Sequence, residues 1–321
     1  MLRQHRSLLF KILPLLLLIS TACGSLVPQP TVAPTQQFVP PSTPSLTQTP
    51  RSPTATATPS FDAARLGTVE RDLIYCTPNG IELKMDIYFP ASDGPWPALV
   101  NIHGGGWTEG GKGSVDASMT ARGFLVVSIN YRLYPEARFP AMIQDVKCAI
   151  RSLRAHAAYI NLDPQRIGLI GHSAGGHLAA LAALADESAG FDVGEYLDQS
   201  SRVQAVLVNA GPVDLTRPFP NYLRRTIGDV FGQEQLVSGS PITYITPDDP
   251  PFIILHGDLD KVVPPEQSQI LYERLIAVGV RAQLFFIHNA DHNFDPVGGA
   301  LSPSWDDLTQ ITTNFWMWNL H

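Results

Sequence analysis

The stretch Gly171-His172-Ser173-Ala174-Gly175 decides how the rest of the chain is interpreted. It follows a short strand-like run at 166–170 and opens an alanine-rich segment at 177–185. A serine between two glycines at a strand-to-helix turn is typical of a nucleophile elbow, because the turn is sharp and its flanking side chains must be small. The helix that follows directs partial positive charge at the serine. The alternative is that Ser173 only caps that helix.

The pattern around this elbow predicts an α/β fold. Strand-like runs alternate with helical periodicity, which indicates a mostly parallel eight-stranded sheet flanked by helices on both faces. We expect the first two strands to pair antiparallel through a turn at Pro78-Asn79-Gly80. The expected strands are 72–75, 81–89, 98–102, 125–129, 167–170, 205–208, 252–255 and 282–287, and the clearest helical patterns are 141–155, 268–278 and 308–318.

The chain is expected to divide into a processed leader, a linker and one domain. Residues 1–22 combine a basic flank, a short apolar core and small residues, which is typical of an export signal. Cys23 follows in a lipobox-like context, so we expect either lipidation there or ordinary cleavage nearby, which would leave a secreted protein. Residues 23–60 are rich in Pro and Thr and predict a disordered linker. Residues 61–321 suit one domain, in which 212–250 is too long for a simple connection and predicts a small cap.

Net charge and the absence of certain motifs argue against several classes of protein. The net charge of −7 and the acidic pI disfavour a nucleic-acid partner. The chain has no zinc-type cysteine spacing, no dinucleotide fingerprint and no P-loop, so we expect no metal and no cofactor. Cys76 and Cys148 form either a disulfide, as an oxidising compartment would permit, or two buried free thiols.

A histidine that could act as a base for Ser173, and a carboxylate that could orient this histidine, occur further along the chain. His292 follows the last predicted strand and would take the serine proton. Asp260 follows the preceding strand and would orient His292. The competitors are His288, which lies closer to its strand, and Asp258, which could instead cap its own turn. The order Ser, Asp, His is that of α/β-hydrolases.

A glycine-rich run follows an early strand at His103-Gly104-Gly105-Gly106-Trp107. Glycines let backbone amides approach a reacting group closely, so the amides of Gly105 and Gly106, together with that of Ala174, predict an oxyanion hole. The alternative for such a run is a flexible loop.

Together these motifs resemble the esterase and lipase branch of the α/β-hydrolases, near its feruloyl-esterase-like and hormone-sensitive-lipase-like groups. The resemblance spans about Leu73 to Trp318. It rests on the glycine run, the elbow, the Asp260 and His292 loops, Asn130-Tyr131-Arg132-Leu133, Phe139-Pro140, 145–149 and Asp163-Pro164. One departure is Asn293, where family members often have glycine.

The resemblance implies a serine carboxylesterase without a cofactor that cleaves small to medium acyl esters, free or on polysaccharides. With the leader, it implies a lipoprotein at the bacterial membrane or a secreted enzyme. The alternatives are a peptidase of the prolyl-oligopeptidase type and a catalytically silent scaffold on the same fold. We expect Tyr131 and Arg132 to brace the site, the latter through an ion pair, and Glu109 and Trp107 either to line the entrance or to lie in surface and core packing.

Overall fold

The computed structural model describes residues 61–113 and 115–321. The predicted export signal, the lipidation site at Cys23 and the linker at 23–60 lie outside the described residues. Across the ranges that are described, no helix is both long and apolar enough to cross a membrane. The described residues therefore belong to the domain that contains the elbow.

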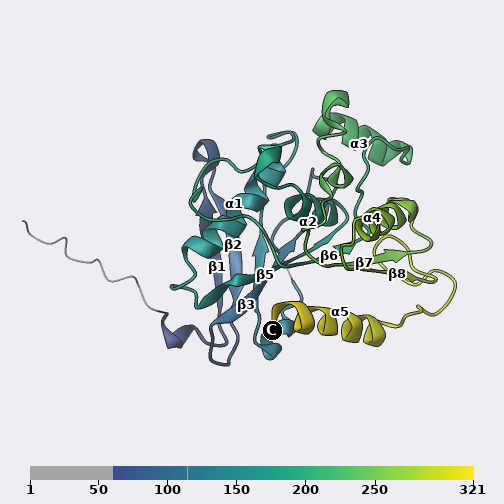
Figure 1. Ribbon diagram of the computed structural model, residues 1–321. Helices are drawn as coiled ribbons and strands as arrows, with labels where there is room; N and C mark the ends of the chain where they lie inside the picture. The colour runs from purple at the N-terminus through teal and green to yellow at the C-terminus, as the bar shows by residue number, and fades with distance from the viewer. Residues whose placement is uncertain (1–60, 114) are drawn as a thin grey trace, which may run out of the picture. The chain divides into compact units, whose positions relative to one another are not determined.

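The sheet has eight strands in the order β1-β2-β4-β3-β5-β6-β7-β8 (Figure 1). Strand β2 pairs antiparallel with β1 and with β4, and all other pairs are parallel. This confirms the predicted fold class. The strands are β1 Val69–Cys76, β2 Leu83–Tyr88, β3 Trp96–Ile102, β4 Leu125–Ile129, β5 Leu162–His172, β6 Ala205–Asn209, β7 Phe252–Gly257 and β8 Ala282–Ile287.

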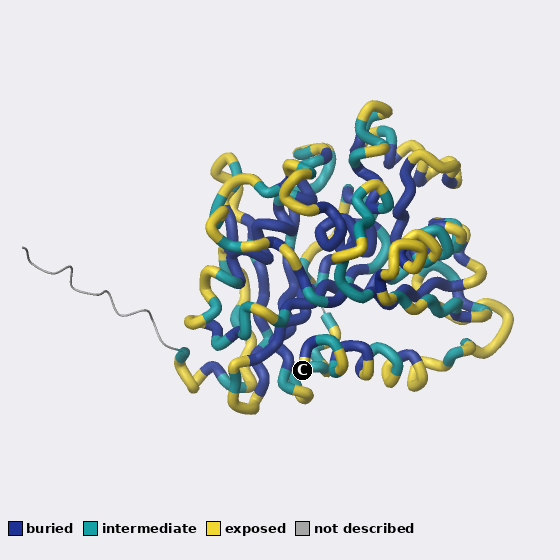
Figure 2. The backbone as a smooth tube through the Cα atoms, viewed as in Figure 1, coloured by how far each residue is buried: buried dark blue, intermediate teal, exposed yellow. Residues whose placement is uncertain are grey.

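Alternation along the central strands builds two apolar cores. In β7, Ile254 points into one core, while Ile253 and Leu255 point into the other. Helices α1, α2 and α4 cover the first face and α5 covers the second, and Figure 1 shows α5 across the sheet from α4. Figure 2 shows the buried strands between these layers. The helices are α1 Ala141–Ala155, α2 Ala174–Leu184, α3 Asn221–Phe231, α4 Glu266–Ala277 and α5 Trp305–Leu320.

Short 3-10 helices occupy several connections. They are η1 Ala63–Arg65, η2 Pro78–Gly80, η3 Ser118–Arg122, η4 Glu187–Ala189, η5 Gln233–Gln235 and η6 Pro241–Tyr244. The segment 212–250, predicted as a cap, joins β6 to β7 and contains α3, η5 and η6. Helix α3 is amphipathic, and it buries Leu223, Ile227, Val230 and Phe231 on one face.

A disulfide joins Cys76 at the end of β1 to Cys148 in α1, where the sequence alone left a bridge and two free thiols open. The two Cα atoms are 6.5 Å apart, and the residues are separated by 72 positions in the sequence. The bridge therefore ties an edge strand of the sheet to the helix that covers it.

Reducing this disulfide should destabilise the domain, because a closed loop of this length restricts the unfolded chain. We expect the free energy of unfolding, measured by urea titration with and without reductant, to fall by about 2–5 kcal/mol. A Cys76→Ala/Cys148→Ala variant should match the reduced protein and be insensitive to reductant. Identical urea midpoints for the oxidised and reduced protein would contradict this stabilising role.

Candidate active site

Ser173 sits on the sharp turn between β5 and α2. Its backbone has φ 55° and ψ −121°, a left-handed conformation that is strained for any residue except glycine. The amide of Ser173 donates to the carbonyl of Asn209, 2.8 Å away at the end of β6, which fixes the turn against the neighbouring strand. The strand-to-helix turn expected from the sequence is thus present, and its serine has elbow geometry.

The two flanking glycines permit close backbone contacts around this turn. A Cβ atom on Gly175 would overlap the carbonyl oxygen of Ile102 and lie 2.6 Å from that of His103, at the end of β3. A Cβ atom on Gly171 would overlap the carbonyl of Gly175. The first turn of α2 therefore packs directly against the carboxyl ends of β3 and β5, with no room for side chains.

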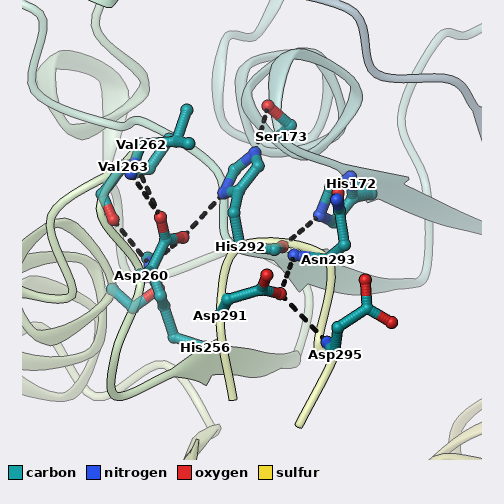
Figure 3. A network of polar contacts seen from close by, with 11 residues as sticks. His172, Ser173, His256, Asp260, Val262, Val263, Asp291, His292, Asn293 and Asp295 are labelled. Carbon is teal, nitrogen blue, oxygen red and sulfur yellow. Dashed lines mark hydrogen bonds and ion pairs between the residues drawn. The ribbon is translucent and has the colours of Figure 1, made fainter. Parts of the chain in front are cut away.

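His292 links Ser173 to Asp260 in the structure (Figure 3). Its Nε2 lies 3.0 Å from Ser173 Oγ, and its Nδ1 lies 2.7 Å from Asp260 Oδ2. Because an ionised carboxylate can only accept, Nδ1 carries the imidazole proton and Nε2 is free to accept from the serine hydroxyl. The three side chains come from the loops after β5, β7 and β8, at one edge of the sheet.

Asp260 is buried and is surrounded by four hydrogen-bond donors. Oδ1 accepts from the amides of Val262 at 2.7 Å and Val263 at 2.9 Å, and Oδ2 faces the imidazoles of His292 and His256. Burial of the carboxyl group favours its neutral form, but the hydrogen bonds from His256 and His292 outweigh burial and hold the pKa of Asp260 well below its ordinary value. The carboxylate therefore stays ionised.

Sequence reasoning gave His256 no role, yet this histidine contacts Asp260 directly. It is fully buried, and its Nε2 lies 3.1 Å from Asp260 Oδ2 and 3.0 Å from the carbonyl of Val263. Its Nδ1 lies 2.6 Å from Ser268 Oγ. Both neighbours of Nε2 are acceptors, so Nε2 carries a proton and His256 donates to the Asp260 site. The only sequence signal was its position at the end of a strand, four residues before Asp260.

His172 is a second contact that the sequence did not reveal. Its Nε2 lies 2.8 Å from the backbone carbonyl of His292, and the two ring centroids are 4.8 Å apart. Burial lowers the pKa of His172, so it donates from Nε2 as a neutral imidazole. The residue before the elbow serine therefore holds the backbone of the histidine that contacts that serine.

The two competitors that the sequence offered pair with each other. His288 Nδ1 lies 2.9 Å from Asp258 Oδ2. The His288 side chain is 66% exposed, whereas that of His292 is 13% exposed. The structure brings His292 and Asp260, and neither competitor, into the hydrogen-bonded chain with Ser173.

The glycine run after β3 lies beside the elbow. A Cβ atom on Gly104 would lie 3.4 Å from Ser173 Cβ. Gly105 and Gly106 have φ values of 105° and 58°, and no acceptor among the described residues faces their amides or that of Ala174. The three predicted oxyanion donors are therefore on segments next to Ser173, with their N–H groups unpaired within the described chain.

Tyr131 and Arg132 are tied to neighbouring segments. The Tyr131 ring stacks on His103 with centroids 4.2 Å apart, and its hydroxyl donates to the His103 carbonyl over 3.0 Å. Arg132 forms an ion pair of 2.6 Å with the buried Asp145.

Glu109 is exposed, but Trp107 is only 1% exposed and belongs to the core rather than to an entrance.

The indole of Trp107 contacts a buried histidine on α2. Trp107 Nε1 lies 3.3 Å from Nδ1 of His177, and His177 Nε2 lies 2.7 Å from the carbonyl of Gly239 in the 212–250 segment. Burial, only partly opposed by the bond to Gly239, lowers the pKa of His177 to about 4. His177 is therefore neutral at pH 7.

Comparison with known proteins gives a consistent family. A model of the family described as BD-FAE matches residues 85–275. Among curated proteins, "Probable carboxylic ester hydrolase LipM" of Mycobacterium tuberculosis is 34% identical over 225 residues, which cover 64% of this chain and 51% of that protein. The chain thus spans about half the length of the curated relatives it matches.

Solved structures of esterases are similar over most of the domain. A truncated carbohydrate esterase from gut microbiota has a TM-score of 0.66 and 31% identity, covering 79% of this chain and 98% of that one. Esterase 2 of Thermogutta terrifontis, described as phosphorylated by paraoxon, has a TM-score of 0.65 and 28% identity, covering 77% of this chain and 92% of that one.

The contact between α2 and β3 can be tested by adding one methyl group. Gly175→Ala should lower the free energy of unfolding by about 1–3 kcal/mol or more, since the new Cβ would overlap backbone atoms. Urea titration followed by circular dichroism measures this change.

Gly228→Ala is the matched control, because Gly228 is also helical and its added Cβ would meet only Gln233 Nε2 at 3.8 Å. It should be neutral or stabilising by up to about 1 kcal/mol. Equal stability of the two variants would show that the elbow is not packed as described.

Proposed function

Because the chain belongs to the BD-FAE family of α/β-hydrolase esterases, we propose that it is a serine carboxylesterase that cleaves small to medium acyl esters. The observation that carries the proposal is the hydrogen-bonded chain from Ser173 through His292 to the ionised Asp260. Supporting it, curated and structural relatives are esterases by name, and one of them has been phosphorylated by an organophosphate.

In the proposed acylation step, Ser173 Oγ attacks the ester carbonyl carbon while His292 Nε2 accepts the hydroxyl proton. Asp260 stabilises the imidazolium that results and keeps the ring oriented through Nδ1. The carbonyl oxygen becomes an oxyanion, which the amides of Gly105, Gly106 and Ala174 are placed to bind. When the tetrahedral intermediate collapses, its bond to the alcohol oxygen breaks and His292 returns the proton to that oxygen.

In the proposed deacylation step, water takes the place of the alcohol. His292 accepts a proton from the water as it attacks the acyl carbon, and the same amides bind the second oxyanion. The bond to Ser173 Oγ then breaks, His292 returns the proton to the serine, and the carboxylic acid leaves. His256 and His172 contribute by holding Asp260 and the backbone of His292 throughout.

Substrates and location extend the proposal. Acyl esters on polysaccharides, acetyl or feruloyl groups included, are candidate substrates, supported by the carbohydrate esterase of similar fold. The basic, apolar and small-residue pattern of 1–22 supports export, and Cys23 supports attachment to the bacterial membrane through lipid.

Turnover of p-nitrophenyl acetate and butyrate tests the chemistry. We expect Ser173→Ala to lower kcat by about 10⁴-fold or more and Asp260→Asn by about 10⁴-fold, because the latter allows the wrong histidine tautomer. Ser92→Ala, on the exposed surface, should keep the wild-type rate.

Three outcomes would contradict the proposed serine carboxylesterase or indicate another function. Equal turnover by wild type and Ser173→Ala would end the proposal. Hydrolysis of aminoacyl amides in preference to esters would indicate a peptidase. A wild-type chain that neither turns over esters nor reacts with a fluorophosphonate probe would indicate a silent scaffold.

Labelled palmitate tests the lipid anchor. Bacteria that produce the full chain should incorporate label into the wild type and not into Cys23→Ala. The Cys76→Ala/Cys148→Ala variant keeps Cys23 and should remain labelled. Label that survives Cys23→Ala would contradict lipidation at this residue.

A further inference from the structure

His177 is buried at the meeting point of three segments that differ in sequence and role. It lies on α2 one turn after the elbow, and its amide donates to the Ser173 carbonyl over 2.9 Å. Its imidazole reaches the other two segments, with Trp107 of the glycine run on one side and Gly239 of the 212–250 segment on the other. The side chain has no exposed surface.

Its two partners determine a single protonation state. An indole N–H can only donate, so His177 Nδ1 must accept from Trp107. A backbone carbonyl can only accept, so Nε2 must carry the proton and donate to Gly239. The neutral Nε2–H tautomer satisfies both contacts. In a protonated ring, the proton on Nδ1 would point at the indole N–H, and two donors would face each other.

Trp107 in turn fixes the end of the glycine run. Its backbone has a strained φ of 61°, and its carbonyl accepts from the amide of Tyr134 over 2.9 Å. The preceding residue is Gly106, and the amides of Thr108 and Glu109 donate back to the Gly105 carbonyl at 3.0 and 3.1 Å. Holding the indole therefore holds a short, internally bonded loop that carries two of the proposed oxyanion donors.

The 212–250 segment also contacts Trp107, His177 and the glycine run directly. Phe231, at the end of α3, packs edge-on against the rings of Trp107 and His177, with centroids 5.1 and 5.4 Å away. Thr226, on the same helix, presents its methyl group toward Gly106. Both contacts hold α3 against the glycine run, while the bond from His177 to Gly239 holds the part of the segment between η5 and η6.

We propose that His177 is a positioning residue, which sets the place of the Gly105 and Gly106 amides by bonding Trp107 to the 212–250 segment. The proposal rests on the proposed esterase function. It implies that the segment predicted as a cap also supports the catalytic loop. His177 itself touches no reacting atom.

Replacing His177 with leucine and with glutamine separates positioning from simple packing. His177→Leu removes both hydrogen bonds, and we expect kcat for p-nitrophenyl acetate to fall about 10- to 100-fold with KM little changed, which is less than the loss of a whole oxyanion donor. Binding of a trifluoromethyl ketone, whose hemiketal carries an oxyanion, should weaken by a similar factor. His177→Gln offers one donor and one acceptor, so it should recover most of the loss.

Hydrogen exchange provides a readout that does not require turnover. Exchange of the Thr108, Glu109 and Tyr134 amides reports whether the loop is held, and it should accelerate about 10-fold or more in His177→Leu. Phe139→Leu is the control, because Phe139 packs on Phe231 with centroids 5.0 Å apart. It should lower stability yet leave both exchange and kcat near wild type.

Two outcomes would overturn the proposal. One is a His177→Leu variant with wild-type kcat and wild-type exchange of these amides. The other is an equal loss in Phe139→Leu and His177→Leu without recovery by glutamine, which would indicate packing alone. A wild-type protein without esterase activity would instead defeat the proposed function, and the exchange measurement would still decide whether His177 holds the loop.

Discussion

The close packing of the first turn of α2 onto the end of β3 is the constraint on which the rest of the site depends. Because Gly175 has no side chain, the carbonyls of Ile102 and His103 approach the helix backbone directly. This contact puts the serine turn next to the glycine run that continues β3. One shared edge of the sheet thus supplies the hydroxyl and the unpaired amides, and no long loop has to bring them together.

The position of Asp260 depends on hydrogen bonds rather than on close backbone packing. Asp260 is buried, and four donors compensate for the water it loses. Two of the donors are backbone amides of its own turn, which the local chain provides. The other two are imidazoles from β7 and the loop after β8, so the carboxylate also cross-links two neighbouring strand ends.

Sequence periodicity predicted what local patterns control, and missed what depends on distant partners. The eight strands follow from short apolar or β-branched runs, and the helix at Ala141–Ala155 follows from apolar residues at helical spacing. Helix α3 was not specified, although Leu223, Ile227 and Phe231 carry helical spacing. His172 and His177 bond carbonyls 120 and 62 residues away, and no local pattern marks such a pair. The choice of Asp260 over Asp258 rested partly on the family resemblance, since both aspartates follow the same strand.

The two-sided core has a consequence for how the chain is made. The face of the sheet formed by Leu99, Leu207 and Ile253 is covered mainly by α5, which comes after every strand in the sequence. During synthesis from the N-terminus, the elements of the opposite core are complete before α5 is made. Until then, this apolar face of the sheet remains exposed to solvent. Newly made chains paused before α5 would therefore be the form most in need of a chaperone.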